Sequence, residues 1–302
     1  MPETLVIALG GNAITRPGEP GTIPQQFEHT AETLGHLMPV FRSDARIVVT
    51  HGNGPQIGNI LIRVEEAERR VPRLPLDTCV SDSQGGMGYM IQRIAFELFR
   101  REHIDRTAVT VITQVLVSEG DPDMVHPTKP IGRFYSTSEM EDVRRERPHW
   151  ELGEIAPGRW RRVVASPRPL RIMEEDAIAC LVQAGVVVIA CGGGGIPVAW
   201  EDDRLVGVEG VVDKERASSL LARDLHAQKL IIVTSKVHTR RAAALWRILA
   251  SKDGQAIVRG VSDEGFRIDH WWGNTSDALD VVREVLGLFN AWAGLPLQPA
   301  QN

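Results

Sequence analysis

The chain has 302 residues, enough for one large α/β domain or for two smaller ones. Its formal net charge is only −5 and its basic residues are dispersed along the sequence, which argues against nucleic acid as a partner. The N-terminus has no basic-then-apolar signal segment, and no apolar stretch is long enough to span a bilayer. We therefore expect a cytoplasmic protein with no membrane partner.

Predicted strands and helices alternate along the chain. Runs rich in Val and Ile predict strands at 4–9, 46–50, 107–117, 186–191 and 229–234. Helical patterns fall between them, at about 24–42, 56–70, 83–103, 172–184 and 214–227. The strand runs are almost continuously apolar, which is typical of strands that are covered on both faces. The predicted fold class is therefore α/β, with a doubly wound, mostly parallel sheet between helix layers.

The first predicted strand ends in a glycine turn. The segment from Leu5 to Ala13 reads L-V-I-A-L-G-G-N-A, so an apolar run stops at Gly10, Gly11 and Asn12. A turn of this kind lets backbone N–H groups approach an anion without a Cβ in the way. Short glycine motifs are common, so taken alone this segment could equally be a tight turn that binds nothing.

Two later strands end in the same way. The strand at 46–50 leads into His51-Gly52-Asn53-Gly54, and the strand at 186–191 leads into Gly192 to Gly195. The carboxyl ends of parallel strands meet at one edge of a sheet, so the three turns are expected to line a single crevice of backbone donors. Such a crevice is suited to phosphate.

The predicted helix at 83–103 carries one apolar stripe. Its members are Met87, Met90, Ile91, Ile94, Ala95 and Leu98. The helix ends in Arg100-Arg101-Glu102, which indicates a solvated end. The three cysteines, Cys79, Cys180 and Cys191, show no C-x-x-C pairing, so we expect buried or free thiols.

Residues 118–168 interrupt the α/β alternation. The segment is polar, rich in Pro, Arg and Glu, and contains no long apolar run. A long interruption of this kind in a compact domain is usually functional or disordered. Disorder stays open as an alternative, although Phe134, Tyr135, Trp150 and Trp160 offer side chains that could pack.

The last predicted helix begins at a cluster of charges. In Val212-Asp213-Lys214-Glu215, Asp213 is expected to be the N-cap and Glu215 to lie in the first turn, where the helix dipole favours negative charge. This capping role requires no catalysis. A lysine at this position could instead bind a phosphate.

Together these motifs resemble the amino acid kinase superfamily and, within it, the carbamate kinases. The matching segments are A-L-G-G-N-A (8–13), T-H-G-N-G-P-Q-I-G-N (50–59), S-Q-G-G-M-G-Y-M-I-Q (83–92), T-Q-V-L-V (113–117), H-P-T-K-P-I-G-R-F-Y (126–135), W-R-R-V-V-A-S-P-R-P (160–169), A-C-G-G-G-G-I-P-V (190–198) and G-V-E-G-V-V-D-K-E (207–215). They stand in the family's order and cover the chain from residue 4 to about residue 234.

The resemblance implies one amino acid kinase-like domain over 1–302. Within it, 118–168 would form a protruding lid and 206–302 a nucleotide-binding half. The implied activity is carbamate kinase, the reversible phosphoryl transfer between ATP and carbamate that gives carbamoyl phosphate and ADP. The implied setting is arginine metabolism in the cytoplasm, in a homodimer formed through helices such as 83–103. The alternatives are a kinase of another small acid and an inactive protein that binds carbamoyl phosphate.

The resemblance also assigns roles to residues. The catalytic set is Lys129 from the lid with Lys214 and Glu215. The set that binds phosphate and substrate is Gly10, Gly11, Asn12, Gly52, Asn53 and Gly54. The set that binds nucleotide is Gly193, Gly194, Asp213 and Thr234. The two lysines would neutralise the transferring phosphoryl group, which is the main requirement of this chemistry.

No His or Cys spacing predicts a protein metal cage, so Mg²⁺ is expected to be held chiefly by the phosphates of ATP or ADP and by water. Carbamate is already an anionic nucleophile and needs no general base, so His51 is expected to be a satisfied core histidine. Both lysines are expected to be exposed, so that their replacement by alanine barely affects folding.

The sequence departs from the family's pattern in two places. The residue after the helix-start lysine is usually Asp, and here it is Glu215, whose side chain is one methylene longer. After Thr234 the chain lacks the family's T-D-V-D-like turn and its G-S-M-G-P-K segment. Lys236 and Lys252 are the residues that could supply the missing cation.

Overall fold

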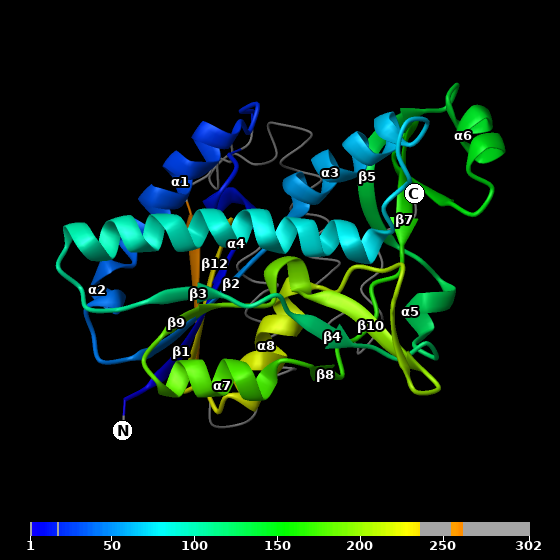
Figure 1. The fold of residues 1–302 in the computed structure, drawn as a ribbon. Coiled ribbons are helices and arrows are strands. Elements are labelled where there is room, and N and C mark those ends of the chain that lie inside the picture. The colour runs from blue at the N-terminus through cyan, green and yellow to red at the C-terminus, as the bar shows by residue number, and fades with distance from the viewer. Residues whose placement is uncertain (1, 17, 236–254, 262–302) are drawn as a thin grey trace.

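The computed structural model describes residues 2–16, 18–235 and 255–261. Six strands form the main sheet, and every neighbouring pair is parallel. Their order across the sheet is β13 (Gln255–Val261), β12 (Lys229–Ser235), β1 (Thr4–Leu9), β2 (Arg46–His51), β9 (Val187–Ile189) and β3 (Ala108–Thr110). The predicted α/β fold with a mostly parallel sheet is confirmed (Figure 1).

Helices cover both faces of this sheet (Figure 1). One layer consists of α1 (Ile23–His36), α2 (Met38–Phe41) and α4 (Leu76–Arg101), and the other contains α7 (Glu175–Gln183) and α8 (Lys214–Asp224). Successive strand residues point to opposite faces, so Leu5, Ile7 and Leu9 of β1 pack toward the first layer. Val6 and Ala8 pack toward the second layer. All five side chains are buried, which explains why β1 is apolar throughout.

Two smaller sheets complete the described part of the fold. The first has the order β11 (Arg204–Gly207), β10 (Ile196–Glu201), β4 (Gln114–Leu116) and β8 (Arg171–Ile172). The second is antiparallel, with the order β5 (Lys129–Ser136), β7 (Arg159–Val164) and β6 (Glu151–Ala156). Short helices α5 (Pro122–Val125) and α6 (Met140–Glu146) lie in the same stretch of chain as the second sheet. Residues 118–168 are therefore folded, and the alternative of a disordered insertion is wrong.

Helix α3 (Gly54–Ala67) and Glu68, the residue after it, hold the 118–168 segment through two carboxylates. The hydroxyl of Tyr135 donates to Glu65 at 3.1 Å, and Arg147 forms an ion pair with Glu68. Burial, outweighing the hydrogen bond from Tyr135 and the nearby arginines, raises the pKa of Glu65 above its usual value of 4.5. Trp150 is buried against the guanidinium groups of Arg73, Arg147 and Arg162. The segment at 118–168 is thus anchored on the α3 side of the molecule.

One predicted strand is wrong in the structure. The apolar run at 107–117 divides into β3 of the main sheet and β4 of the four-stranded sheet. Gln84 brackets the crossing, because its side-chain amide donates to the carbonyl of Thr113 and accepts from the N–H of Thr113. Other elements cover both halves of the run, so its residues are apolar on both sides of the point where the chain passes from one sheet to the other.

The predicted helix at 83–103 is right in type, but its first residue is wrong. Helix α4 begins at Leu76, directly after Pro75, and ends at Arg101. Leu76, Cys79 and Val80 extend the buried stripe by two turns, and the polar residues between them hid this extension in the sequence. The six apolar residues predicted to form the stripe are all buried.

All three cysteines are free thiols, with Cys79 and Cys191 buried and Cys180 exposed, as expected. None of the helices in the described part of the chain is long and apolar enough to cross a membrane. Lys236 and Lys252, named above as candidate cations, lie outside the described residues.

Candidate active site

The first two glycine turns meet at the carboxyl edge of the main sheet. Strands β1 and β2 are parallel neighbours, and Leu9 at the end of β1 pairs with His51 at the end of β2. The N–H of Gly52 donates to the carbonyl of Leu9 at 3.0 Å. A Cβ built on Gly52 would lie 3.7 Å from the amide nitrogen of Gly11. The two turns are therefore adjacent, as the sequence predicted.

The third turn packs against the second and requires glycine to do so. It follows β9 as the short helix η2 (Gly192–Gly194). Gly193 and Gly194 have φ values of +66° and +97°, in the region that favours glycine. A Cβ on Gly193 would lie 2.2 Å from Nδ2 of Asn53, and one on Gly194 would lie 2.0 Å from the carbonyl oxygen of Val212. The turn therefore joins the second glycine motif to the start of α8.

Asn53 is held in place by a residue that the site prediction omitted. Its side-chain Nδ2 donates to the hydroxyl of Ser83 at 2.7 Å, and Ser83 donates in turn to the carbonyl of Val80 on α4. Both side chains are buried. Ser83 is the first residue of the S-Q-G-G-M-G segment, which is one of the segments that carry the family resemblance. No general pattern marks a serine as the support of an asparagine thirty residues earlier in the chain.

Asp213 occupies the N-cap position of α8 but does not act as its cap. No cap hydrogen bond reaches its side chain. The carboxylate instead forms an ion pair with Lys129 at the start of β5. The expected position is therefore correct, whereas the expected capping contact is replaced by a contact between the helix start and the 118–168 segment. Lys129 is brought to the same cluster as Lys214, its partner in the predicted catalytic set.

Lys214 reaches into the space beside the first two glycine turns, Gly10 to Asn12 and Gly52 to Gly54, which we call the cradle. Its Nζ donates to the carbonyl of Leu9 at 3.4 Å and lies 3.3 Å from Oε1 of Glu215. A Cβ on Gly52 would lie 3.9 Å from this Nζ. The Lys214 side chain is only 11% exposed, compared with 37% for Lys129. The expectation that both lysines are exposed is therefore wrong for Lys214, because the ends of β1 and β2 cover it.

Glu215 lies in the field of both lysines. Burial alone would raise its pKa, and Asp213 acts in the same direction. Lys214 and Lys129 outweigh these effects and hold the pKa of Glu215 below its usual value of 4.5. The carboxylate is therefore ionised at neutral pH, and it can orient the ammonium group of Lys214.

His51 is buried with its Nδ1 3.1 Å from the carbonyl oxygen of Gly52. Burial, with a smaller contribution from Lys214, lowers its pKa from 6.5 to about 4. The imidazole is neutral at pH 7 and too weakly basic to accept a proton there. The description of His51 as a core histidine therefore agrees with its surroundings.

Two predicted site residues are placed only by their backbone. Asn12 is the middle residue of the short helix η1 (Gly11–Ala13), whose N-cap residue is Gly10. Thr234 lies near the end of β12, one residue beyond Val233, which pairs with Leu9. Both positions are at the carboxyl edge of the sheet where the glycine turns meet. Their side chains lie outside the described part of the structure.

Among the described residues, no group of three or more His, Cys, Asp and Glu side chains could hold a metal ion. Asp213 and Glu215 are the carboxylates at the cradle, and both contact lysines. This donor set would suit a magnesium ion that is held chiefly by nucleotide phosphates and water rather than by a cage of protein carboxylates.

The family model described as the amino acid kinase family matches residues 3–237. The chain belongs to this family. It is 45% identical to the carbamate kinase-like protein YahI of Escherichia coli over 78% of the chain and 75% of that protein. It is 40% identical to a carbamate kinase of Pyrococcus horikoshii over 78% of the chain and 75% of that enzyme. These relatives place it with the carbamate kinases and carbamate kinase-like proteins.

A solved structure of an amino acid kinase family member supports the same assignment. The carbamate kinase of Giardia lamblia bound to AMP-PNP is 38% identical, with a TM-score of 0.73. The match covers 78% of this chain and 74% of that one. The family match ends at residue 237, close to the point at which the sequence motifs cease.

Proposed function

We propose that this amino acid kinase is a carbamate kinase, which transfers a phosphoryl group reversibly between ATP and carbamate. The observation that carries the proposal is the convergence of Gly11, Gly52 and Lys214, since a Cβ built on Gly52 would lie 3.7 Å from the amide nitrogen of Gly11 and 3.9 Å from Nζ of Lys214. Lys129 joins this cluster through Asp213. Backbone donors and two ammonium groups around one small space are the parts that phosphoryl transfer requires. The relatives named carbamate kinase support this choice of acceptor.

In the proposed mechanism the residues act by position and charge. Backbone N–H groups of the first two glycine turns, other than that of Gly52, which donates to Leu9, bind the oxygens of the transferring phosphoryl group. Lys214, at the start of α8, neutralises these oxygens with its ammonium group, which lies beside the end of β1. Glu215 keeps the ammonium group of Lys214 oriented. Carbamate attacks as an anion, so the neutral His51 has no proton to remove. Lys129 approaches from β5 and adds the second positive charge.

The nucleotide-binding role falls to Gly193, Gly194, Asp213 and Thr234 in this proposal. Magnesium carried by ATP or ADP would neutralise charge on the leaving phosphate. The tight packing of the third glycine turn against Val212 would fix the start of α8, and with it Lys214, relative to the nucleotide. The AMP-PNP complex of the Giardia lamblia enzyme supports nucleotide use.

The direct test is a coupled assay in the direction of ATP synthesis. Purified protein is mixed with ADP, Mg²⁺ and carbamoyl phosphate, and ATP is read through hexokinase and glucose-6-phosphate dehydrogenase. ATP formation well above a no-enzyme control is the expected result. No ATP above background would rule the activity out.

A second candidate function is that of a protein that binds carbamoyl phosphate without turning it over. It is favoured by the end of the family match at residue 237, which leaves the rest of the chain without the family's C-terminal lysine segment. Calorimetric titration with carbamoyl phosphate and with ADP separates the two candidates. Binding of carbamoyl phosphate without any turnover would support the second candidate, whereas turnover would eliminate it. A screen of small carboxylic acids with ATP tests the remaining alternative, a different acceptor.

We propose further that the enzyme is a cytoplasmic homodimer of arginine metabolism and that α4 contributes to the dimer contact. Tyr89 and Phe96 on α4 are large hydrophobic side chains that are 59% and 44% exposed in the single chain. Burial of such side chains is typical of a contact between subunits. Light scattering at micromolar concentration should give twice the chain mass, and a monomer mass would remove this proposal.

A further inference from the structure

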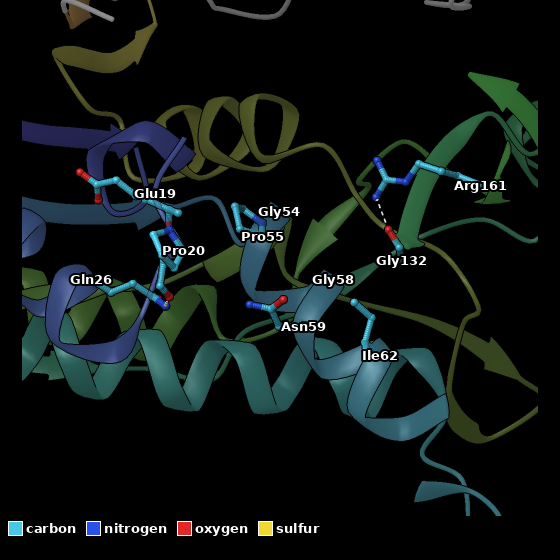
Figure 2. A pocket seen from close by; sticks show the side chains of 12 residues that line it. Glu19, Pro20, Gln26, Gly54, Pro55, Gly58, Asn59, Ile62, Gly132 and Arg161 are labelled. Atoms are coloured by element: carbon cyan, nitrogen blue, oxygen red, sulfur yellow. Dashed lines mark hydrogen bonds between the residues drawn. The ribbon is translucent and has the colours of Figure 1, made fainter. Parts of the chain in front are cut away.

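A cavity of about 270 Å³ lies between the antiparallel sheet of the 118–168 segment and the N-terminal ends of α1 and α3. Figure 2 shows its walls, which consist of residues from four separate parts of the chain. Gly54, Pro55 and Gly58 come from the start of α3, Gly132 from β5 and Arg161 from β7. Gly54 belongs to the second glycine turn, so the cavity adjoins the phosphate cradle.

Arg161 is a cation for which the cavity offers no anionic partner. Its Nη2 donates to the carbonyl of Gly132 at 2.7 Å, as Figure 2 shows, and its guanidinium lies 5.1 Å from the ring centroid of Phe134. Its Nε is buried without a hydrogen-bond partner. Within the described part of the chain no carboxylate forms an ion pair with it. Burial, with no compensating charge, lowers the pKa of the group below 12.5. An unpaired, partly buried cation is costly, and an anion beside it would offset that cost.

The opposite wall of the cavity also favours negative charge. Helix α3 has 14 residues, and the side chain of Asn53, its N-cap residue, makes no cap hydrogen bond because it donates to Ser83. The uncapped N-terminal turn carries the positive end of the helix dipole. The acidic side chain in the cavity wall, Glu19, contacts His29 at 2.6 Å.

We propose that this cavity binds the carboxylate-type group of the acceptor and that Arg161 is the residue that recognises it. The inference rests on the proposed kinase function and deepens it. A guanidinium presents two parallel N–H groups that match the two oxygens of a planar carboxylate. The ammonium groups of Lys129 and Lys214 are point charges, which suit the phosphoryl group in the cradle. Arg161 and the cradle thus divide recognition between acceptor and phosphate, with Gly54 common to both sites.

The size of the cavity is consistent with a small acceptor and its water. One water takes about 30 Å³ in the liquid, so about 270 Å³ holds an anion of four heavy atoms together with several waters. A substrate larger than carbamate is therefore not needed to fill the cavity.

The test compares Arg161→Gln with a matched control on the same strand. Arg159 lies two residues earlier on β7, is exposed and also contacts the Phe134 ring, yet it does not line the cavity. We expect Arg161→Gln to raise the KM for carbamate at least tenfold and to leave the KM for ATP within twofold. Arg161→Lys keeps the positive charge but loses the two parallel N–H groups, so its KM for carbamate should lie between those of the wild type and Arg161→Gln. Arg159→Gln should have the same KM values as the wild type. A carbamate KM within twofold of the wild type in Arg161→Gln would overturn the inference, as would an equal rise in the KM for ATP.

A binding measurement keeps this inference separate from the proposed activity. Bicarbonate labelled with ¹³C is a planar anion of the same shape as carbamate, and its NMR line should broaden with wild-type protein and Arg159→Gln but not with Arg161→Gln. Equal broadening with all three proteins would overturn the site even if the enzyme is active. If line broadening is lost only in Arg161→Gln, the result supports the site even when the wild type shows no turnover. The absence of turnover would then contradict only the kinase proposal. Circular dichroism identifies an unfolded variant, and Arg161→Lys then replaces it in both measurements.

Discussion

Replacement of Gly52 by alanine would place a methyl group in the centre of the proposed phosphate cradle. The added Cβ would lie 3.7 Å from the amide nitrogen of Gly11, 3.7 Å from Cδ of Lys214 and 3.9 Å from its Nζ. An oxygen that accepts from both nitrogens would need to lie about 2.7–3.2 Å from each of them. We expect the methyl carbon, which lies close to the same two nitrogens, to compete with the oxygen for this space.

The same distances predict that the fold tolerates the change. All three are ordinary van der Waals contacts, and the φ of Gly52 is not in the left-handed region. A glycine with a compatible backbone can even gain about 0.4–1 kcal/mol of stability when alanine replaces it. We therefore expect a folded Gly52→Ala protein with an unfolding free energy at or slightly above that of the wild type.

The expected loss is one of catalysis. A blocked oxyanion contact costs about 2.7–4 kcal/mol of transition-state stabilisation, or about 10²–10³ in turnover. The coupled assay for ATP synthesis measures the rate, and urea unfolding measures stability. Gly35→Ala on α1 is the control, because a Cβ there meets nothing within 4 Å and the site is outside the cradle. A folded Gly52→Ala protein that keeps more than about a fifth of wild-type turnover would refute the cradle.

Three further predictions concern residues at the same edge of the sheet, and the first of them compares the two lysines. Lys214→Ala should lose about 10²–10³ in turnover and also about 1–3 kcal/mol of stability, because it leaves the Glu215 carboxylate without its partner. Lys129→Ala should lose turnover, but its free energy of unfolding should change by less than about 1 kcal/mol. The coupled assay measures turnover and urea unfolding measures stability. Gly194→Ala should lose at least about 3 kcal/mol in urea unfolding, since its Cβ would lie 2.0 Å from the Val212 carbonyl oxygen at a φ of +97°, and a wild-type midpoint would contradict the packing. The His51 side chain binds a proton near pH 6.5 in the unfolded chain but only near pH 4 in the folded one, so its contribution to stability is present above about pH 6.5 and is lost as the pH falls. The free energy of unfolding should fall by about 2 kcal/mol between pH 6.5 and pH 5. His51→Gln should not show this loss.

Four strands of the main sheet, β1, β2, β9 and β12, could be predicted from the sequence to within two residues at each end. The strand expected at 4–9 is β1, Thr4–Leu9, and the one expected at 229–234 is β12, Lys229–Ser235. Coverage on both faces makes their residues uniformly apolar, and a glycine turn or a polar loop marks each end. The same uniformity defeated the prediction at 107–117, where an apolar run gives no sign that its two halves pair with different strands.

The meeting of the glycine turns could also be predicted, because parallel strands deliver their carboxyl ends to one edge. The surroundings of single side chains could not. A lysine at the start of a helix reads as exposed, and Lys214 is covered only because β1 ends beside it. Arg161 lies within the W-R-R-V-V segment, and no pattern in that segment assigns a role to it. Arg161 stands out because no carboxylate of the described residues forms an ion pair with it, and the sequence alone does not show which side chains surround it in the folded chain.

The charge balance of the cradle leads to a last prediction, for Asp213. Two ammonium groups, Lys129 and Lys214, face two carboxylates, Asp213 and Glu215, so the cluster is formally neutral at pH 7. A phosphoryl group therefore gains attraction from directed N–H groups and from magnesium on the nucleotide, while each carboxylate opposes its binding. Asp213→Asn removes one of these charges, and asparagine is as well suited as aspartate to a helix start. One charge at about 6 Å, with an effective dielectric constant between those of water and of a protein surface, is worth about 1–2 kcal/mol, so carbamoyl phosphate should bind roughly tenfold more tightly. Turnover should fall, because Lys129 loses the partner that positions it. Calorimetry and the coupled assay measure the two effects separately. Weaker binding of carbamoyl phosphate to Asp213→Asn would contradict this argument. It would mean that the Asp213 carboxylate contacts the ligand directly and that its negative charge does not lower the affinity for carbamoyl phosphate.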